Sequence, residues 1–196
     1  MGTQGVGIEG KMNVVERLDV RLGASIIPIN SITSTQYLGS NRTTINLQPR
    51  FSNVHLLADW RPFKFSGSNP LSGNFKLTAG GAYFIRSEGT ANISLADSYF
   101  YGDIELPKED IGVVTATAKW SHFAPYGGLG LDNIPVFNNF MIGFEMGTYY
   151  ISNPSASIVG TNFLVDNDQN GPKLQSNLKS YQFMPVFQVN FNFKIK

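Results

Sequence analysis

The sequence predicts a closed, antiparallel, transmembrane β-barrel of about eight strands, which takes up residues 1–196 as a single domain. Only 15% of the residues are charged, against roughly 25% in a typical soluble domain, so much of the surface is expected to face something other than water. The apolar runs are short, whereas a transmembrane helix needs about 18 apolar residues. Apolar and polar residues alternate with a period of two, which is typical of strands with two different faces.

The alternation is clearest near the C-terminus, where every second residue from Tyr181 to Ile195 is apolar and the residues between them are mostly polar. The same pattern predicts six further strands, at 5–12, 18–26, 54–62, 74–86, 123–131 and 140–150. The apolar faces carry no charge in their central part, where a charge would cost ~2–4 kcal/mol at the middle of a bilayer. We therefore expect these faces to point outward, toward lipid.

Short and long connections alternate between these strands. The short links lie at 13–17, 66–73 and 132–139, and the long, polar links lie at about 30–52, 87–121 and 152–180. Short periplasmic turns and long extracellular loops are typical of outer-membrane barrels. Within 87–121, the stretches Ser98–Leu106 and Gly112–Trp120 resemble strands and are expected to form a hairpin beyond the membrane or to add to the barrel wall.

The predicted strand count is seven, whereas bacterial single-chain barrels have an even number of strands. An additional strand upstream of Met1 is the favoured explanation, and a wall contribution from 98–120 is the alternative. The first 25 residues contain no continuous apolar stretch of the kind that a signal peptide has.

Charged residues gather on the faces opposite the apolar ones. These predicted interior residues are Glu9, Lys11, Asp19, Arg21, His55, Asp59, Arg61, Lys76, Arg86 and Glu145. Apart from His55, they comprise four acids and five bases. An eight-stranded barrel is just wide enough to be filled by its own side chains, and buried charges must be paired. The pattern therefore predicts an interior plugged by a polar network, with a path for protons or small solutes as the alternative.

Other classes of site find little support. The net charge of +1 gives no basis for nucleic-acid binding, and the chain has no cysteine. Gly5–Gly10 matches the pattern G-x-G-x-x-G, but it lacks the preceding strand and the following helix that a dinucleotide site needs, so no cofactor is expected. His55 and His122 are the only histidines, too few for a zinc site. Ser121 and His122 are the one candidate catalytic pair, but adjacent residues of a strand point to opposite faces. We therefore expect no enzymatic activity.

A calcium-loop pattern begins at Asp166. The residues Asp166, Asp168 and Asn170 fit its first half, but Asn177 stands where the pattern requires a bidentate Glu. A loop turn rich in Asn and Asp is the favoured interpretation. A weak site for calcium, or for calcium bridged to lipopolysaccharide, is the alternative.

Several stretches resemble a known family. They are Leu57–Phe63, Phe75–Gly81, Ala124–Leu131 and the alternating C-terminal strand. These stretches are similar to the small eight-stranded outer-membrane β-barrels of Gram-negative bacteria, broadly OmpW-like or OmpX-like. The resemblance implies a location in the cell outer membrane, contact with its lipid and lipopolysaccharide, and partners in the barrel-assembly machinery and among other envelope proteins. Such barrels usually end on an aromatic residue, whereas Lys194, Ile195 and Lys196 follow Phe193 here.

The expected function is that of a non-enzymatic barrel, either a structural or accessory component or a narrow, porin-like channel for small or apolar solutes. Two alternatives remain open. In a soluble, lipocalin-like barrel that binds a lipid, the aromatic residues would point inward and the charges outward. An outer-membrane enzyme that modifies lipids would need a catalytic group near the outer leaflet.

Overall fold

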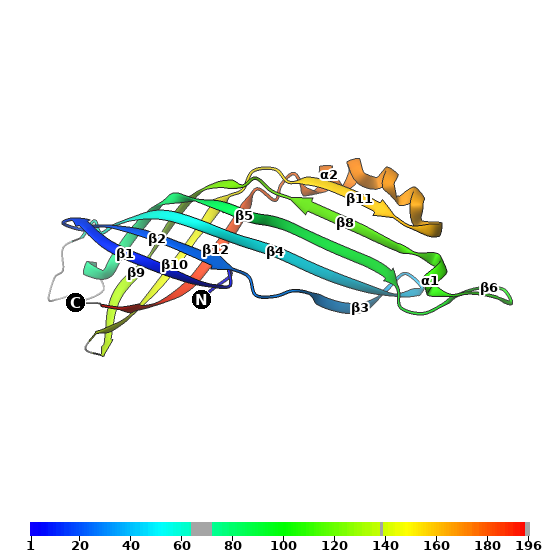
Figure 1. The fold of residues 1–196 in the computed structure, drawn as a ribbon, viewed down its shortest axis with the longest axis horizontal. Helices are drawn as coiled ribbons and strands as arrows, with labels where there is room; N and C mark the ends of the chain where they lie inside the picture. Colours follow the sequence, from blue (N-terminus) through cyan, green and yellow to red (C-terminus); the bar gives the residue numbers. More distant parts are fainter. Residues whose placement is uncertain (64–71, 138, 195–196) are drawn as a thin grey trace.

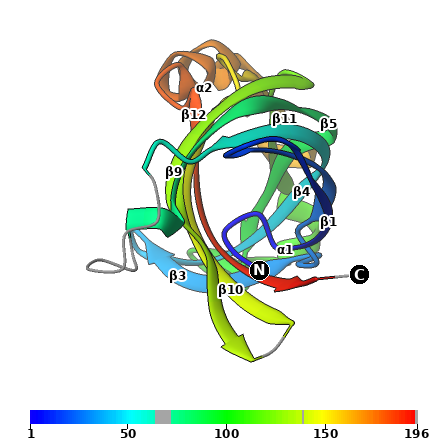
Figure 2. The same cartoon turned by 90° about the vertical axis from the view of Figure 1, so that its left-hand side faces the viewer.

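The computed structural model describes residues 1–63, 72–137 and 139–194, which form a curled antiparallel sheet (Figures 1 and 2). Seven strands follow one another as neighbours in the sheet in chain order. They are β1 (Val6–Val15), β2 (Leu18–Ile26), β4 (Asn41–Trp60), β5 (Phe75–Leu95), β9 (Phe123–Phe137), β10 (Phe140–Tyr150) and β12 (Phe183–Phe193). Each of the seven predicted strands is therefore present. The link at 66–73 and residue Ile195 fall largely outside the described residues.

Strands β4 and β5 are 20 and 21 residues long, and they run well beyond their neighbours at one end of the molecule (Figure 1). There β3 (Ile32–Leu38) pairs with β4, and β8 (Val113–Lys119) pairs with β5 and with β11 (Ser155–Gly160). We call this part of the sheet the extension; it comprises β3, β8, β11 and residues 41–51 and 87–95 of β4 and β5. The remainder of the seven-stranded sheet is called the barrel.

The prediction of long loops at 30–52 and 87–121 is wrong, because much of both segments is strand. Residues 98–106 form a small hairpin of β6 (Tyr99–Tyr101) and β7 (Ile104–Leu106). The stretch 112–120 was expected to form a hairpin with 98–106, but most of it joins the extension as β8. The helical segments are η1 (Ser72–Asn74), α1 (Lys108–Ile111), η2 (Asn162–Asn170) and α2 (Gly171–Leu178). No helix in the described ranges is long and apolar enough to cross a membrane.

The predicted division of the strands into two faces is confirmed in the barrel. On β4, the side chains of Val54, Leu56 and Trp60 are exposed, whereas those of His55 and Asp59 are buried. The period of two causes this separation, because successive side chains of a strand point to opposite sides of the sheet.

The prediction that Arg86 lies on the interior face is wrong. Ser52 pairs with Arg86, but the next residue of β4, Asn53, pairs with Phe84, so Ile85 is an extra residue in β5. This β-bulge reverses the alternation. Phe84 and Ser87 are both buried on the inner face, and Arg86 is exposed on the outer face.

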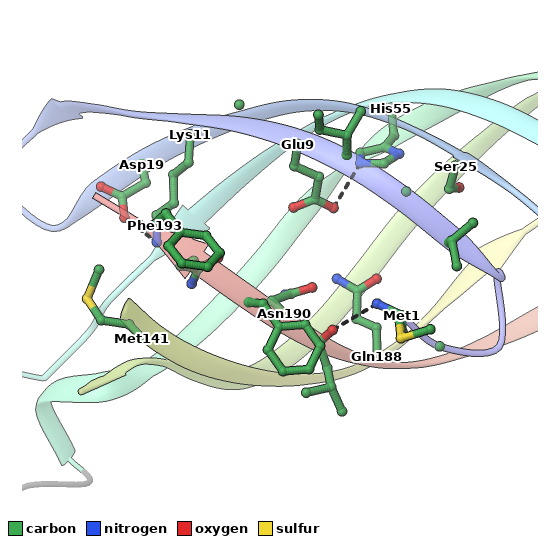
Figure 3. Close-up of a pocket in the computed structure, with 18 of the residues that line it drawn as sticks. Met1, Glu9, Lys11, Asp19, Ser25, His55, Met141, Gln188, Asn190 and Phe193 are labelled. Atoms are coloured by element: carbon green, nitrogen blue, oxygen red, sulfur yellow. Dashed lines mark hydrogen bonds and ion pairs between the residues drawn. The ribbon is translucent and has the colours of Figure 1, made fainter. Parts of the chain in front are cut away.

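The two edge strands, β1 and β12, are joined through the N-terminal segment. The Met1 amino group donates to the Val189 carbonyl at 2.9 Å, and the amide of Val189 donates to the Met1 carbonyl at 2.8 Å. The amide of Thr3 donates to the Phe187 carbonyl at 3.0 Å. Beyond these bonds, a cavity of about 990 Å³ lies between β1 and the last residues of β12 (Figure 3). We call the region between β1 and β12 the seam. Among the described residues, backbone hydrogen bonds cross the seam where the N-terminal segment lies against β12.

Candidate functional site

The interior of the barrel holds a set of charged side chains that six strands or strand ends contribute. The structure brings together nine of the ten predicted interior residues in ion pairs, all except Arg86. It adds Asp132 of β9, which the sequence analysis missed because the predicted strand stopped at residue 131. We call this set the interior network: Glu9, Lys11, Asp19, Arg21, His55, Asp59, Arg61, Lys76, Asp132 and Glu145.

Arg21 lies at the centre of the interior network. Its guanidinium nitrogens lie 2.9 Å from a carboxylate oxygen of Glu9, 2.8 Å from one of Asp59 and 2.7 Å from one of Glu145. Lys76 Nζ shares two of these carboxylates, at 3.1 Å from Asp59 Oδ2 and 2.6 Å from Glu145 Oε2. The side chains of Arg21, Asp59, Lys76 and Glu145 are at most 3% exposed. Two cations and two anions therefore alternate in a space closed to water.

Neutral side chains also donate hydrogen bonds to these buried carboxylates. Tyr126 donates its hydroxyl to Glu145 Oε1 at 2.7 Å, and Thr78 donates to Asp59 Oδ1 at 2.7 Å. A buried ion pair is stable only when its remaining donors and acceptors are also satisfied. The barrel meets this requirement with residues of the same inner face, because Thr78 follows Lys76 by one strand period.

A second group of charges lies toward the end of the barrel that carries the β1–β2 turn. Lys11 pairs with Asp132 and, at 3.2 Å, with Asp19; Arg61 Nη1 lies 2.9 Å from Asp19 Oδ2. Asn192 of β12 donates to Asp132 at 2.8 Å. Lys11 is 24% exposed and Arg61 is 19% exposed, so water reaches this group more easily than it reaches Arg21.

His55 extends the network toward the seam. Its Nε2 lies 3.0 Å from Glu9 Oε1 (Figure 3), and its Nδ1 lies 3.0 Å from Asn53 Oδ1. The interior network contains five carboxylates and four Lys or Arg side chains, so its formal charge is −1 with a neutral imidazole and zero with an imidazolium. The sequence analysis expected the opposite imbalance, because it counted Arg86 and lacked Asp132.

Aromatic side chains fill the interior between the network and the extension. The Tyr149 ring lies 4.6 Å from that of Tyr126 and 5.6 Å from that of Phe84, measured between ring centroids. Phe51 and Trp120 continue this cluster of tilted and edge-on rings, at 5.6 Å from each other. We call these five rings the aromatic layer. Tyr149 is 2% exposed and therefore belongs to the interior.

The remaining candidates have structural contacts. His122 Nδ1 lies 2.7 Å from the Phe84 carbonyl oxygen, and its ring stacks on Tyr83. Asp168 accepts a hydrogen bond from the Gly160 amide at 2.7 Å. Asp166 and Asn170 are exposed on η2, a helical turn that leads into α2, so the expected loop is wrong here. Within the described ranges, no three His, Cys, Asp or Glu side chains are grouped so that they could hold a metal ion.

A curled antiparallel sheet with an interior of charged and aromatic side chains defines a small β-barrel protein. Neither a protein-family model nor a curated protein matches the sequence. Two solved structures are similar in fold, CarO2 and CarO of Acinetobacter baumannii, each with a TM-score of 0.64. CarO2 is 21% identical and matches 98% of this chain over 93% of its own length; CarO is 22% identical and matches 99% of this chain over 94% of its own length. At this level of identity the similarity concerns the fold, and the resemblance to OmpW-like or OmpX-like barrels stays a prediction.

Proposed function

We propose that this chain is a non-enzymatic protein of the bacterial outer membrane, and that its filled barrel serves as a structural or accessory component of the envelope. Its immediate surroundings would be outer-membrane lipid and lipopolysaccharide, and it would be inserted by the barrel-assembly machinery. The fold similarity to CarO, an outer-membrane β-barrel protein, supports this location.

The observation that carries the proposal is a change of chemistry along the outer face of β4. In the barrel, the outward residues of β4 from residue 54 on are Val54, Leu56, Ala58 and Trp60; in the extension, they are Arg42, Thr44, Asn46, Gln48 and Arg50. Exposed apolar side chains on one stretch and polar ones on the next suit a strand that passes from lipid into water. A soluble, lipid-binding barrel would need the reverse arrangement, with the charges of the interior network on the outside.

The filled interior supports a structural role over that of an open channel. The interior network is hydrogen-bonded within itself, and the aromatic layer covers it on the side of the extension. Opening a path through the interior network would separate buried charges from their partners, which costs several kcal/mol per ion. The engagement of His122 by Phe84 and Tyr83 supports the absence of a catalytic role.

Planar lipid bilayers test this proposal directly. The purified chain is expected to show little steady conductance, whereas large, stable channels would overturn the structural role. A variant with Phe84→Ala and Tyr149→Ala thins the aromatic layer and is expected to leak more than the native chain. The matched control, Tyr83→Ala with Tyr150→Ala, removes outward-facing rings from the same strands and should remain closed.

Location and activity are tested separately. Native chain expressed in a Gram-negative host should fractionate with outer membranes and require detergent for extraction; monodisperse protein in plain buffer would contradict a membrane location. Mass spectrometry of lipid A from cells with and without the gene should give the same spectrum. A changed lipid A would favour the lipid-modifying enzyme instead.

A narrow path for small or apolar solutes is the second candidate function, and the seam favours it. The cavity there is lined by apolar side chains such as Met141 and Phe193 as well as by Glu9 and Asn190 (Figure 3). Substituting Asn190→Trp narrows the cavity from the inner face of β12. If liposomes that contain the native chain take up a small uncharged solute, this variant should slow the uptake; equal uptake would exclude the seam as the path.

A further inference from the structure

The extension contains a cavity of about 410 Å³ that is separate from the interior network. Its floor is formed by small side chains on β5 and β8, namely Gly89, Ala91, Ala116 and Ala118. Leu174 and Leu178 of α2 lie on the other side of the cavity. Figure 1 shows α2 beside β8 and β11 at the far end from the β1–β2 turn.

The strand register explains why the side chains on this face of the sheet leave an open space. Ala91 of β5 pairs with Leu47 of β4 on one side and with Ala116 of β8 on the other. In the adjacent row, Gly89 pairs with Pro49 and with Ala118. Four neighbouring positions on this face, two on each strand, therefore carry a methyl group or less in the middle of the sheet. A Cβ atom at Gly89 would meet nothing closer than the Trp120 ring at 3.9 Å, so the space above this glycine is open.

The helix above the floor is held at a fixed place by Gln175. Its side-chain oxygen accepts a hydrogen bond from the Ala156 amide at 2.6 Å, and its side-chain nitrogen donates to the Pro154 carbonyl at 2.6 Å. Leu174 and Leu178 are four residues apart, so they share one face of α2. Because Gln175 ties the helix to β11, the two leucines stay above the alanines and do not collapse onto them.

The chemistry of the lining selects the kind of molecule that fits. Its side chains are aliphatic apart from Gln48, Thr90 and Thr117, which alternate with the floor and wall residues and so belong to the opposite face of the sheet. An ionised group placed here would lose its water without gaining a partner. An apolar molecule would instead remove apolar surface from water, which is favourable. The volume lies within the range of about 300–1,000 Å³ that is usual for ligand pockets.

We propose that this cavity is a binding site for small, uncharged, apolar molecules, such as a single aromatic ring or a short alkyl chain. The proposal goes beyond the structural role of the barrel and does not depend on whether the barrel conducts. It concerns only the contacts between the extension and α2.

Trp120 provides a local reporter for the test. The chain has two tryptophans, and Trp60→Phe leaves Trp120, which lies next to Gly89, as the sole one. Bromobenzene quenches tryptophan fluorescence on contact. The full-length Trp60→Phe chain, held in lipid nanodiscs, should show quenching by bromobenzene that saturates, on top of a linear contribution from probe dissolved in the lipid.

Two variants fill the site independently, Ala116→Leu and Ala91→Leu. Each should weaken the saturable component at least tenfold. The matched control is Ala58→Leu, which makes the same change on the outward face of β4 in the barrel and should leave the component unchanged. Far-UV circular dichroism and heat-modifiable migration confirm that each variant is folded. If both filling variants fail to fold, Leu178→Ala, which removes part of the wall without crowding the sheet, should weaken binding severalfold.

Three results would overturn the proposal. Quenching that never saturates and is equal in all variants would mean that bromobenzene only partitions into lipid. A saturable component that survives both filling variants would place the probe elsewhere. Equally tight quenching by 4-bromobenzoate would show that the site accepts a charge and is not the apolar cavity described above.

Discussion

The barrel and the extension share the strands β4 and β5 but have opposite faces. In the barrel, apolar side chains such as Leu56 point outward and charged ones such as Asp59 point inward. In the extension, polar side chains such as Asn46 and Asn92 lie on the outer face, and the inner face carries Leu47 and Ala91. The inner face of the same sheet therefore carries charge at one end and apolar side chains at the other. The outer-membrane location that we propose, with lipid around the barrel and water around the extension, would account for which face is apolar in each region.

The two long strands reverse their faces by different means. In β4, the alternation itself changes phase, since the apolar residues are even-numbered from Val54 to Trp60 and odd-numbered from Ile45 to Phe51. In β5, the odd-numbered residues are the more apolar throughout, and the bulge at Ile85 turns them from the outer to the inner face. The bulge lies opposite Ser52 and Asn53, at the level where β4 changes phase. The apolar side of the sheet therefore changes from the outer to the inner face at the same level in both strands.

The largest effect is expected from removing the central cation of the interior network. Arg21→Met would leave Asp59 and Glu145 with Lys76 as their main partner, and Glu9 with His55. Breaking a buried ion pair by removing one member costs about 3–5 kcal/mol. Urea unfolding of the chain in detergent, followed by heat-modifiable migration, should show a loss of stability of this size.

Arg86→Met is the matched control for Arg21→Met. Because Arg86 is exposed on the outer face, its replacement should change the free energy of unfolding by no more than about 0.5 kcal/mol. Equal losses for the two variants would contradict both the central place of Arg21 and the face assigned to Arg86.

The next largest effect separates the outer faces of the two regions. Leu56→Arg places a charge on the apolar outer face of the barrel and should cost about 2–4 kcal/mol in a bilayer. Gln48→Arg makes the corresponding change on the outer face of the extension, beside Asn46, and should cost close to nothing. Equilibrium folding into lipid vesicles measures both. A similar cost at the two positions would remove the argument that a membrane boundary crosses β4.

A smaller effect is expected at the edge of the interior network. Asp132→Asn removes the anion that faces Lys11 and the amide of Asn192, and the loss of hydrogen bonds to a charged group costs about 1.5–3 kcal/mol. The partial exposure of Lys11 places this variant at the lower end of that range. Urea unfolding of the Asp132→Asn and Arg21→Met variants under the same conditions compares their losses of stability. A loss as large as that of Arg21→Met would mean that the two groups of charges form one cooperative unit.

Much of the barrel could be predicted because a period of two assigns each residue to a face without any knowledge of distant contacts. All seven strands and nine of the ten predicted interior residues follow from it. Arg86 could not be assigned, because a bulge leaves the alternation in the sequence unbroken while it reverses the faces. Asp132 was within reach, since it continues the face of Tyr126 and Gly130, had the strand been extended past Leu131.

The extension was harder to predict, because its pairing partners are distant in sequence. The segment 88–94, which contains Gly, Thr and Asn, resembles a loop, and the strand-like stretch 112–120 was expected to form a hairpin with 98–106. Only the pairing of 113–119 with 88–94 shows that these two segments belong to one sheet. The Asn and Asp residues before α2 predicted an irregular loop, whereas the structure has the helical segment η2 there. The contact of Gln175 with the backbone of β11 that holds this helix leaves no pattern in the sequence.

The smallest expected effect tests whether the extension is built as a unit separate from the barrel. Gln175→Ala removes two hydrogen bonds to the backbone at Pro154 and Ala156, each worth about 0.5–1.5 kcal/mol. Because α2 packs on β11 and not on the barrel, we expect faster amide hydrogen exchange in α2 and β11, with the barrel strands unchanged. Lys173→Ala, an exposed change on the same helix, serves as the control and should leave the exchange rates as they are. Faster exchange that spreads to β9 and β10 would mean that the extension and the barrel unfold together, and that the two interiors depend on each other in spite of their opposite chemistry.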